Sequence, residues 1–139
     1  MKRTASAEWK GSLKEGKGTV STESGVLSQA QYSFSTRFEN GKGTNPEELV
    51  AAAHAGCFSM ALSAELGKAN VTPESIATTA TLTMEKLDSG WTVTEIHLDV
   101  KGKVPAGSEG AFDTAANAAK AGCPISRLLN TKITMTVQR

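Results

Sequence analysis

The sequence lacks an excess of charge of either sign, a long apolar run and a secretory leader. Charged residues make up 21% of its 139 residues and the net charge is +1, so no strong field would attract a nucleic acid or an acidic membrane surface. No run of about 18 apolar residues predicts a membrane span. The two basic residues near the N-terminus are not followed by an apolar segment, unlike a secretory signal. We therefore expect a cytoplasmic protein that binds neither nucleic acid nor membrane.

Cysteine is also scarce. The chain has only two, Cys57 and Cys123, and they are too far apart in sequence to form a CxxC redox motif. Stable structural disulfides are rare in the cytoplasm. A pair of cysteines there is more often free, catalytic or redox-active.

The length suits one domain, residues 1–139. Alternating polar and apolar residues predict strands at residues 4–9, 19–22, 25–40, 76–87, 91–104 and 131–138. The turn at residues 88–90 makes the fourth and fifth of these the clearest hairpin. In residues 25–40 the alternation puts Tyr32, Phe34 and Phe38 on one face, so Arg37 is expected to point away from the aromatic rings.

A long helix is predicted after residue 45. Asn45 suits the N-cap, Pro46 the first helical position, and Glu48 completes a capping-box-like pattern. Residues 49–66 are apolar or small on nearly every face, which is typical of a buried helix. A chain this short has little material to wrap such a helix alone, so we expect a sheet on one side and a partner subunit on the other.

The rest of the chain predicts a second helix and a short helical turn. Residues 108–121 are rich in alanine, with Ser108 as a possible cap and Phe112 as the main apolar anchor. Gly122 ends this helix, and Cys123 can occupy the N-cap of a turn at residues 124–130. Strands, long helix, hairpin, helix and strand in this order predict an α+β fold with a mainly antiparallel sheet.

The residues around the cysteines allow four interpretations. Cys57 can be a buried apolar filler, half of a disulfide with Cys123, or a metal ligand together with His54, which lies three residues earlier on the same helix face. A structural zinc site needs four ligands, and His97 is not an obvious fourth. His54 by itself is better explained as a packed or hydrogen-bonded helix residue. The fourth interpretation is a reactive dithiol.

A reactive Cys57 would need a lowered thiol pKa, because the thiolate is the nucleophile. Arg37 is the best-placed cation among the strand residues, and a partly buried arginine needs a carboxylate partner such as Glu47. Glu47 and Cys57 lie ten residues apart on one helix, about 15 Å along its axis, so Glu47 would have to serve Cys57 from another subunit. Alternatively, Glu47 and Glu48 are a solvated helix start that complements the helix dipole.

Three motifs carry a resemblance to a known family. GKGTVSTESGVL (residues 16–27), TRFENGKGTNPEELVAAAHAGCFSMAL (36–62) and KAGCP (120–124) resemble the OsmC branch of the OsmC/Ohr family, named for osmotically inducible protein C and organic hydroperoxide resistance protein. The resemblance spans essentially the whole chain. It implies an α+β fold with curved, mainly antiparallel sheets around a long central helix, in an intertwined homodimer.

The resemblance also implies an activity, a thiol-dependent peroxidase that reduces organic hydroperoxides in stress defence. By motif position, Cys57 would be the peroxidatic cysteine, Cys123 the resolving cysteine, and Arg37 with Glu47 the activating pair. The enzyme would need no metal, flavin or haem, only an external thiol or dithiol such as a dihydrolipoyl group. The apolar residues Phe58, Met60 and Leu62 would suit an organic peroxide, although they are also ordinary core residues.

Two other functions remain open from the sequence. One is a non-enzymatic stress protein that binds small apolar ligands or senses redox state. The other is a thiol–disulfide oxidoreductase acting on proteins, which the mid-helix position of Cys57 disfavours.

Overall fold

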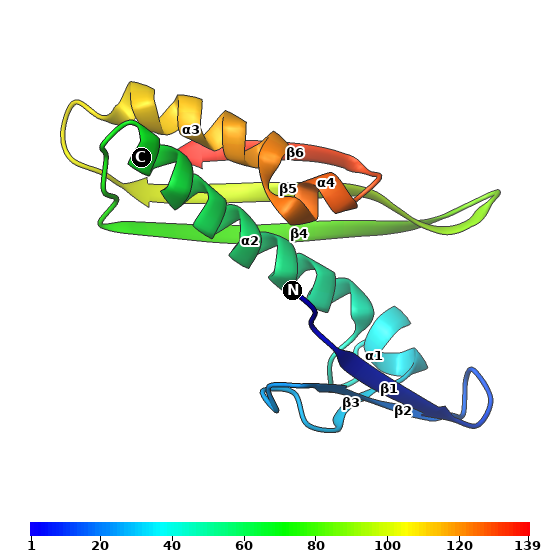
Figure 1. Ribbon diagram of the computed structural model, residues 1–139. Coiled ribbons are helices and arrows are strands. Elements are labelled where there is room, and N and C mark those ends of the chain that lie inside the picture. The colour runs from blue at the N-terminus through cyan, green and yellow to red at the C-terminus, as the bar shows by residue number, and fades with distance from the viewer. The chain divides into compact units, whose positions relative to one another are not determined.

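The computed structural model describes residues 1–139, which form two compact units, residues 1–49 and residues 50–139. Each unit contains one three-stranded sheet (Figure 1). Helices and strands occur in the order strands, long helix, hairpin, helix and strand. The predicted α+β class is therefore confirmed.

The first unit has an antiparallel sheet of order β1-β2-β3 followed by a short helix. The elements are β1 (Ala5–Lys10), β2 (Lys17–Thr22), β3 (Ala30–Tyr32) and α1 (Phe34–Phe38). Gly18 in β2 pairs with Trp9 on one side and Tyr32 on the other, and the two rings lie 5.5 Å apart. A side chain at Gly18 would collide with both rings, so only glycine lets them pack against each other.

The predicted strand at residues 25–40 is wrong over its second half, which forms helix α1. Ser33 caps this helix: its hydroxyl accepts a hydrogen bond from the Thr36 backbone N–H, and the Thr36 hydroxyl accepts one from the Ser33 N–H. Phe34 and Phe38 lie one turn apart, with ring centroids separated by 4.9 Å. Residues spaced by four satisfy both strand and helix patterns in so short a segment, and the capping box decides for helix.

Helix α2 (Pro46–Lys68) is the long helix predicted from the sequence. Asn45 caps it by accepting from the Glu48 backbone N–H at 2.8 Å, as expected. The Glu48 carboxylate does not complete the capping box but accepts a hydrogen bond from Thr44 instead. Only a narrow stripe spaced by four residues is fully buried within the chain: His54, Phe58, Leu62 and Leu66.

The opposite side of α2 is exposed within this chain. Met60 is 78% exposed, and small residues surround it along the helix. By length and composition α2 could also cross a membrane, with a mean hydropathy of 1.4 over 18 residues, a test that core helices of soluble proteins pass as well. The sequence-based expectation of no membrane-length apolar segment therefore overlooked α2, whose apolar residues are interrupted by small polar ones.

The second unit is built on a sheet of order β4-β5-β6. Its strands are β4 (Ser75–Leu87), β5 (Gly90–Lys103) and β6 (Lys132–Gln138). β4 and β5 form the predicted hairpin, while β6 pairs with β5 in parallel. The sheet is therefore mixed, because the chain returns through two helices before β6 and enters the sheet in the same direction as β5.

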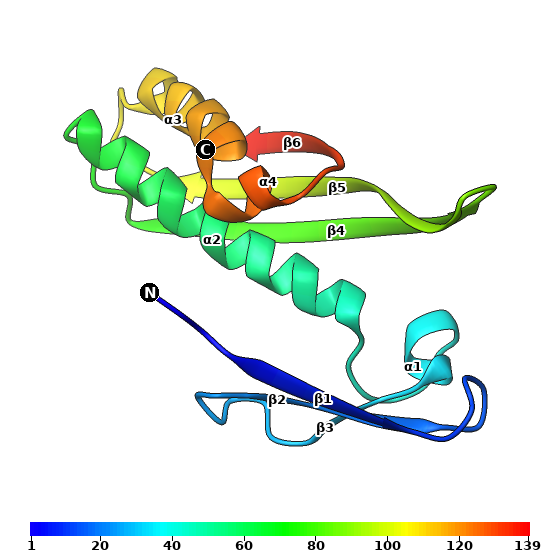
Figure 2. The same cartoon turned by 45° about the vertical axis from the view of Figure 1, so that its right-hand side comes forward.

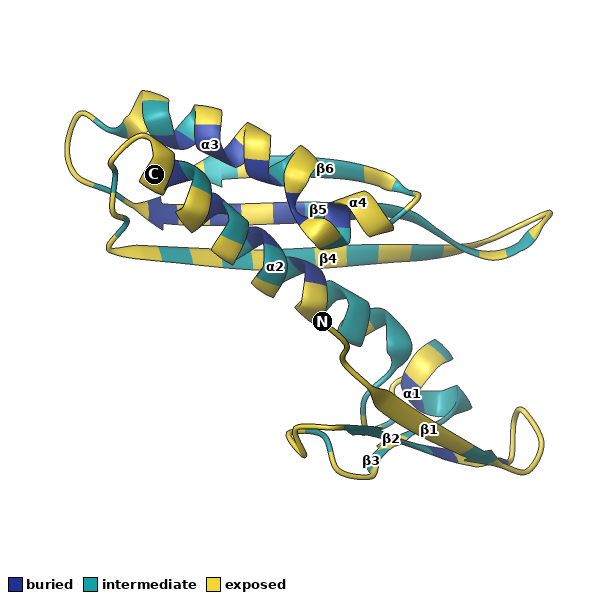
Figure 3. Cartoon of the chain, viewed as in Figure 1, coloured by how far each residue is buried: buried dark blue, intermediate teal, exposed yellow.

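The core of the second unit lies between its sheet and its helices, as the burial colours of Figure 3 show. Helices α2, α3 (Glu109–Gly122) and α4 (Pro124–Leu128) lie on the same side of the sheet in both views (Figures 1 and 2). Phe58, Leu62, Ile96, Leu98 and Phe112 are all fully buried. Phe112 is thus the anchor of α3 that the sequence predicted.

The junction between α3 and α4 is formed by Cys123. Ser108 makes no side-chain cap at the start of α3, contrary to expectation. Cys123, in contrast, is both the C-cap of α3 and the N-cap of α4, where its sulfur accepts a hydrogen bond from the Ser126 backbone N–H. The predicted cap at this position is confirmed.

The contact between β5 and α3 yields a stability prediction. A Cβ at Gly102 would overlap the ring of Phe112, whereas nothing lies within 4 Å of a Cβ at Gly110. Gly102→Ala should lower the free energy of unfolding by about 1–3 kcal/mol through overpacking. The control Gly110→Ala should raise it by up to about 1 kcal/mol, because alanine favours the helix. Urea denaturation at one protein concentration measures both, and equal effects would contradict the packing described.

Candidate active site

The two cysteines meet in the second unit. Cys57 lies in the middle of α2 and is half-buried, and Cys123 at the start of α4 is fully buried. Both are free thiols. Cys57 packs against the buried core that contains Cys123, and both Cys123 and the Ile125 backbone lie close enough to shift its pKa. The fold thus brings together two thiols that the sequence could only suggest as a pair.

The surroundings of Cys57 hold it mostly as a neutral thiol. Burial is the largest influence and raises its pKa, and the neighbouring Cys123 side chain raises the pKa further. The backbone hydrogen bond at Ile125 acts in the opposite direction and lowers the pKa. Within this unit, therefore, the expected lowering of the thiol pKa is not found.

His54 and Ser126 complete the surroundings of the thiols, and sequence reasoning missed their role. His54 is fully buried, and its Nε2 lies 2.7 Å from the Ser126 hydroxyl. That hydroxyl also accepts a hydrogen bond from the Cys123 thiol at 3.1 Å. The expectation that His54 is a hydrogen-bonded helix residue is confirmed. In the sequence, the only feature that could have indicated the contact between Ser126 and Cys123 is their three-residue spacing, which is typical of a helix N-cap.

Arg37 and Glu47, the other two predicted site residues, both lie in the first unit. Arg37 lies on helix α1, not on a strand, and its guanidinium carbon is 5.3 Å from the Phe38 ring centroid. The expectation that it points away from the aromatic residues is therefore wrong. Its Nε and Nη2 lie 2.7 and 2.6 Å from Glu47 Oε1. Both nitrogens share one oxygen, and the buried Oε2 has no hydrogen-bond partner.

Aromatic side chains line a cavity beside Arg37. A cavity of about 260 Å³ is lined by Arg37 and by Trp9, Leu13, Tyr32, Phe34 and Phe38. By contrast, Phe58 and Leu62, which the sequence suggested as an apolar substrate surface, are fully buried core residues. The aromatic cavity beside Arg37 is a better candidate surface for an apolar group.

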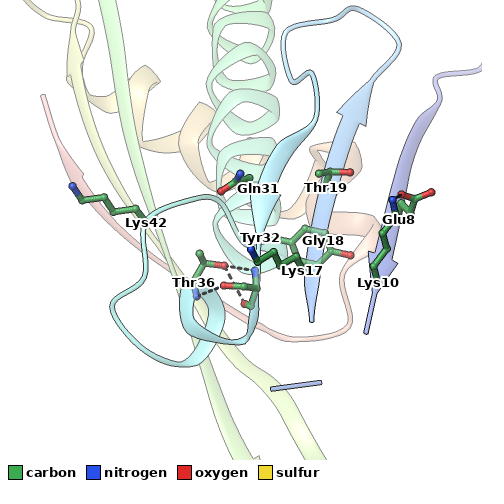
Figure 4. A pocket seen from close by; sticks show the side chains of 10 residues that line it. Glu8, Lys10, Lys17, Gly18, Thr19, Gln31, Tyr32, Thr36 and Lys42 are labelled. Atoms are coloured by element: carbon green, nitrogen blue, oxygen red, sulfur yellow. Dashed lines mark hydrogen bonds and ion pairs between the residues drawn. The ribbon is translucent and has the colours of Figure 1, made fainter. Parts of the chain in front are cut away.

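A second cavity in the first unit has a different character. It has a volume of about 330 Å³, and Figure 4 shows three lysines, Lys10, Lys17 and Lys42, among the side chains that line it. No cysteine contributes to its wall. Elsewhere, no group of three or more His, Cys, Asp or Glu side chains is arranged to hold a metal ion.

Known proteins resemble this chain over most of its length. The sequence model described as OsmC-like protein matches residues 39–138. The chain is 55% identical to Peroxiredoxin OsmC of Escherichia coli K12 over 132 residues, which cover 95% of this chain and 92% of that protein.

The chain belongs to the OsmC-like family.

Solved structures show that the fold is that of this family. The organic hydroperoxide resistance protein OhrB of Bacillus subtilis superposes with a TM-score of 0.75 at 25% identity, over 97% of this chain and 98% of that one. An organic hydroperoxide resistance protein OsmC from Legionella pneumophila gives a TM-score of 0.75 at 23% identity, over 98% and 97% of the two chains. The resemblance read from the three sequence motifs is therefore confirmed.

The contact between the two thiols makes the reactivity of Cys57 depend on Cys123. Because Cys123 raises the Cys57 pKa, Cys123→Ala should lower that pKa and increase the thiolate fraction at pH 7. Each unit of pKa lowering increases that fraction about tenfold. The measurement is the rate of Cys57 alkylation by iodoacetamide, resolved by peptide mass spectrometry. Ser63→Ala, at an exposed position of the same helix, should leave the rate unchanged; a slower rate in Cys123→Ala would contradict the contact.

Proposed function

We propose that this OsmC-like protein is a thiol-dependent peroxidase that reduces organic hydroperoxides to alcohols. The observation that carries the proposal is the contact between the half-buried Cys57 and the buried Cys123. Relatives support it: the Escherichia coli protein is named a peroxiredoxin, and the Bacillus subtilis protein an organic hydroperoxide resistance protein.

The proposed reaction uses the two thiols in turn. The Cys57 thiolate attacks the terminal peroxide oxygen, the O–O bond breaks, and the alkoxide leaves and is protonated to an alcohol. Cys57 is now a sulfenic acid. Cys123 attacks its sulfur, water leaves, and a Cys57–Cys123 disulfide forms. An external thiol or dithiol then reduces the disulfide by exchange.

The thiolate needs a cation that the second unit does not supply to Cys57. The Arg37–Glu47 pair is the proposed source, because its guanidinium is fixed by a charge-assisted hydrogen bond from Nε and an ion-pair contact from Nη2, both to Glu47 Oε1. Along α2, Glu47 and Cys57 are separated by about 15 Å at 1.5 Å per residue. We therefore propose a homodimer in which the pair of one chain serves Cys57 of the other.

The substrate class follows from the same pair. If Arg37 lies beside the reacting thiol of a partner, the aromatic cavity next to Arg37 lies beside the peroxide. Apolar ring surfaces would favour an organic substituent over hydrogen peroxide. The cavity also gives the second candidate function, non-enzymatic binding of a small apolar ligand, which predicts no peroxide consumption.

The division of roles between the two cysteines tests the proposal. With cumene or t-butyl hydroperoxide and dithiothreitol or dihydrolipoamide, the wild type should turn over and Cys57→Ser should not. Cys123→Ser should consume about one equivalent of peroxide and keep a sulfenic acid, which dimedone traps. If Cys123→Ser is as inactive as Cys57→Ser from the first turnover, the roles are assigned wrongly. If the wild type consumes no peroxide, the ligand-binding alternative is favoured.

Mixed dimers test whether the site is shared between chains. In a heterodimer of Cys57→Ser and Glu47→Ala chains, a site shared in trans leaves one site with both defects and the other intact. Such heterodimers should keep about half of the wild-type activity, because one of the two sites keeps both its Cys57 and the Glu47 that holds Arg37 by a charge-assisted pair. The measurement is peroxide consumption by heterodimers purified through two different tags, with sedimentation velocity to establish the dimer.

The control for this experiment is the Glu47→Ala homodimer. That homodimer should be strongly impaired, and activity per remaining Cys57 as low in the heterodimer as in the homodimer would mean that Glu47 acts within its own chain. A fully active Glu47→Ala homodimer would mean that Glu47 does not act at all. An active, monodisperse monomer would remove the shared site altogether.

A further inference from the structure

A buried line of hydrogen bonds connects Cys123 to His54. The Cys123 thiol donates to the Ser126 hydroxyl at 3.1 Å, and that hydroxyl lies 2.7 Å from His54 Nε2. Because the Ser126 oxygen already accepts from the thiol, its own hydrogen is available to donate to Nε2. The neutral imidazole then accepts at Nε2 and carries its proton on Nδ1.

His54 is suited to accept a proton only briefly. Its side chain is fully buried and burial lowers its pKa, so it rests in the neutral form. Nδ1 is buried and has no hydrogen-bond partner, so no carboxylate holds the ring as a permanent imidazolium. A neutral histidine two hydrogen bonds away from a buried thiol can accept the thiol proton as a general base.

Few ionisable groups face this line. Cys57 shares helix α2 with His54, Arg127 on α4 is exposed, and Lys120 on α3 lines a cavity of about 260 Å³ together with Ser126. The buried sheet residues Ile96, Leu98 and Val100 that face the helices are apolar, and Thr78 contributes a hydroxyl that bonds Ser59. The proton of Cys123 therefore has one buried base within reach.

We propose that Ser126 and His54 form a proton relay that activates Cys123 as the resolving thiol. This inference rests on the proposed peroxidase function. Ser126 touches the reacting sulfur, and His54 is a positioning residue that acts through it.

The relay acts in the second chemical step. As Cys123 attacks the Cys57 sulfenic acid, its proton passes to Ser126 and the serine proton passes to His54 Nε2. The S–S bond forms, the S–O bond of Cys57 breaks, and the oxygen leaves as hydroxide, which is protonated to water. His54 afterwards releases its proton to solvent, so the net step is sulfenic acid plus thiol to disulfide plus water. In reduction, the same path returns a proton to the departing Cys123 thiolate.

A single-turnover experiment separates this relay from the peroxidase function. Reduced protein is mixed with one equivalent of t-butyl hydroperoxide and quenched with N-ethylmaleimide. Mass spectrometry then follows peroxide-dependent loss of the Cys57 thiol as the first phase and disulfide formation as the second. A wild type without the first phase would remove both proposals, whereas failure confined to the second phase would remove the relay alone.

The pH profile of the second phase is the decisive readout. Because burial holds the His54 pKa below its ordinary value of 6.5, the wild-type rate should be nearly constant at pH 6.5 and above and should fall only at lower pH, where His54 becomes protonated. In His54→Gln it should be at least about tenfold slower at pH 7, within the range of general-base effects, and should rise with pH as Cys123 ionises unaided. The first phase should be unchanged. An equal slowing at every pH, or no slowing, would show that His54 is only structural.

Matched variants complete the test. Ser126→Ala should reproduce the His54→Gln profile, and Ser126→Thr, which keeps the hydroxyl, should restore the second phase. His97→Asn is the histidine control, because His97 bonds Thr134 and Thr136 on the sheet, away from both thiols. Should His54→Gln fail to fold, the wild-type inflection must coincide with the His54 imidazole titration measured by NMR, with His97→Asn assigning the signals. An inflection elsewhere would overturn the relay.

Discussion

The chemistry of this chain depends on the packing of one narrow stripe of α2 against the sheet and α3. Phe58, Leu62 and Leu66 lose all contact with solvent, and a fully buried side chain of this kind contributes about 1.5–3 kcal/mol. Cys57 precedes Phe58, so the same packing fixes its sulfur. Cys123 is fixed from the other side by capping α4. The two thiols meet because both helices are held on one face of the sheet.

The burial that brings the thiols together works against their reactivity. Desolvation raises the Cys57 pKa, and a neighbouring thiol raises it further. Locally, only the Ile125 backbone acts in the opposite direction and lowers the Cys57 pKa, while the Ser126 backbone N–H donates to the Cys123 sulfur. The chain also carries a fixed cation, Arg37, held by Glu47. Burying a charged guanidinium and its carboxylate beside the thiols would cost desolvation energy. In the proposed dimer the second chain supplies this ion pair, so no single chain buries the whole charged site in its own core.

Predictions from the sequence succeeded where a few neighbouring residues determine the outcome. Asn45 and Pro46 mark the start of α2, and Cys123 before Pro124 marks a cap, because these backbone hydrogen bonds close within three or four residues. The alternating segments around residues 88–90 gave the hairpin for the same reason. The strand prediction for residues 34–38 failed because aromatic residues spaced by two and four fit both the strand period and the helix period. The parallel pairing of β6 was equally hidden, since strand direction depends on the path of the intervening helices.

The sequence by itself determined most of the elements, the family motifs and the residue types of the proposed site: two thiols, an arginine and a glutamate. Only the tertiary structure decided which of them touch. His54 and Ser126 are 72 positions apart and bond only because α2 and α4 pack together. Met60 and Phe58 read alike as apolar helix residues, yet one is exposed and the other fully buried. Periodicity records the chain's local hydrogen bonding, whereas contacts between distant segments depend on how whole faces fit, which no local pattern encodes.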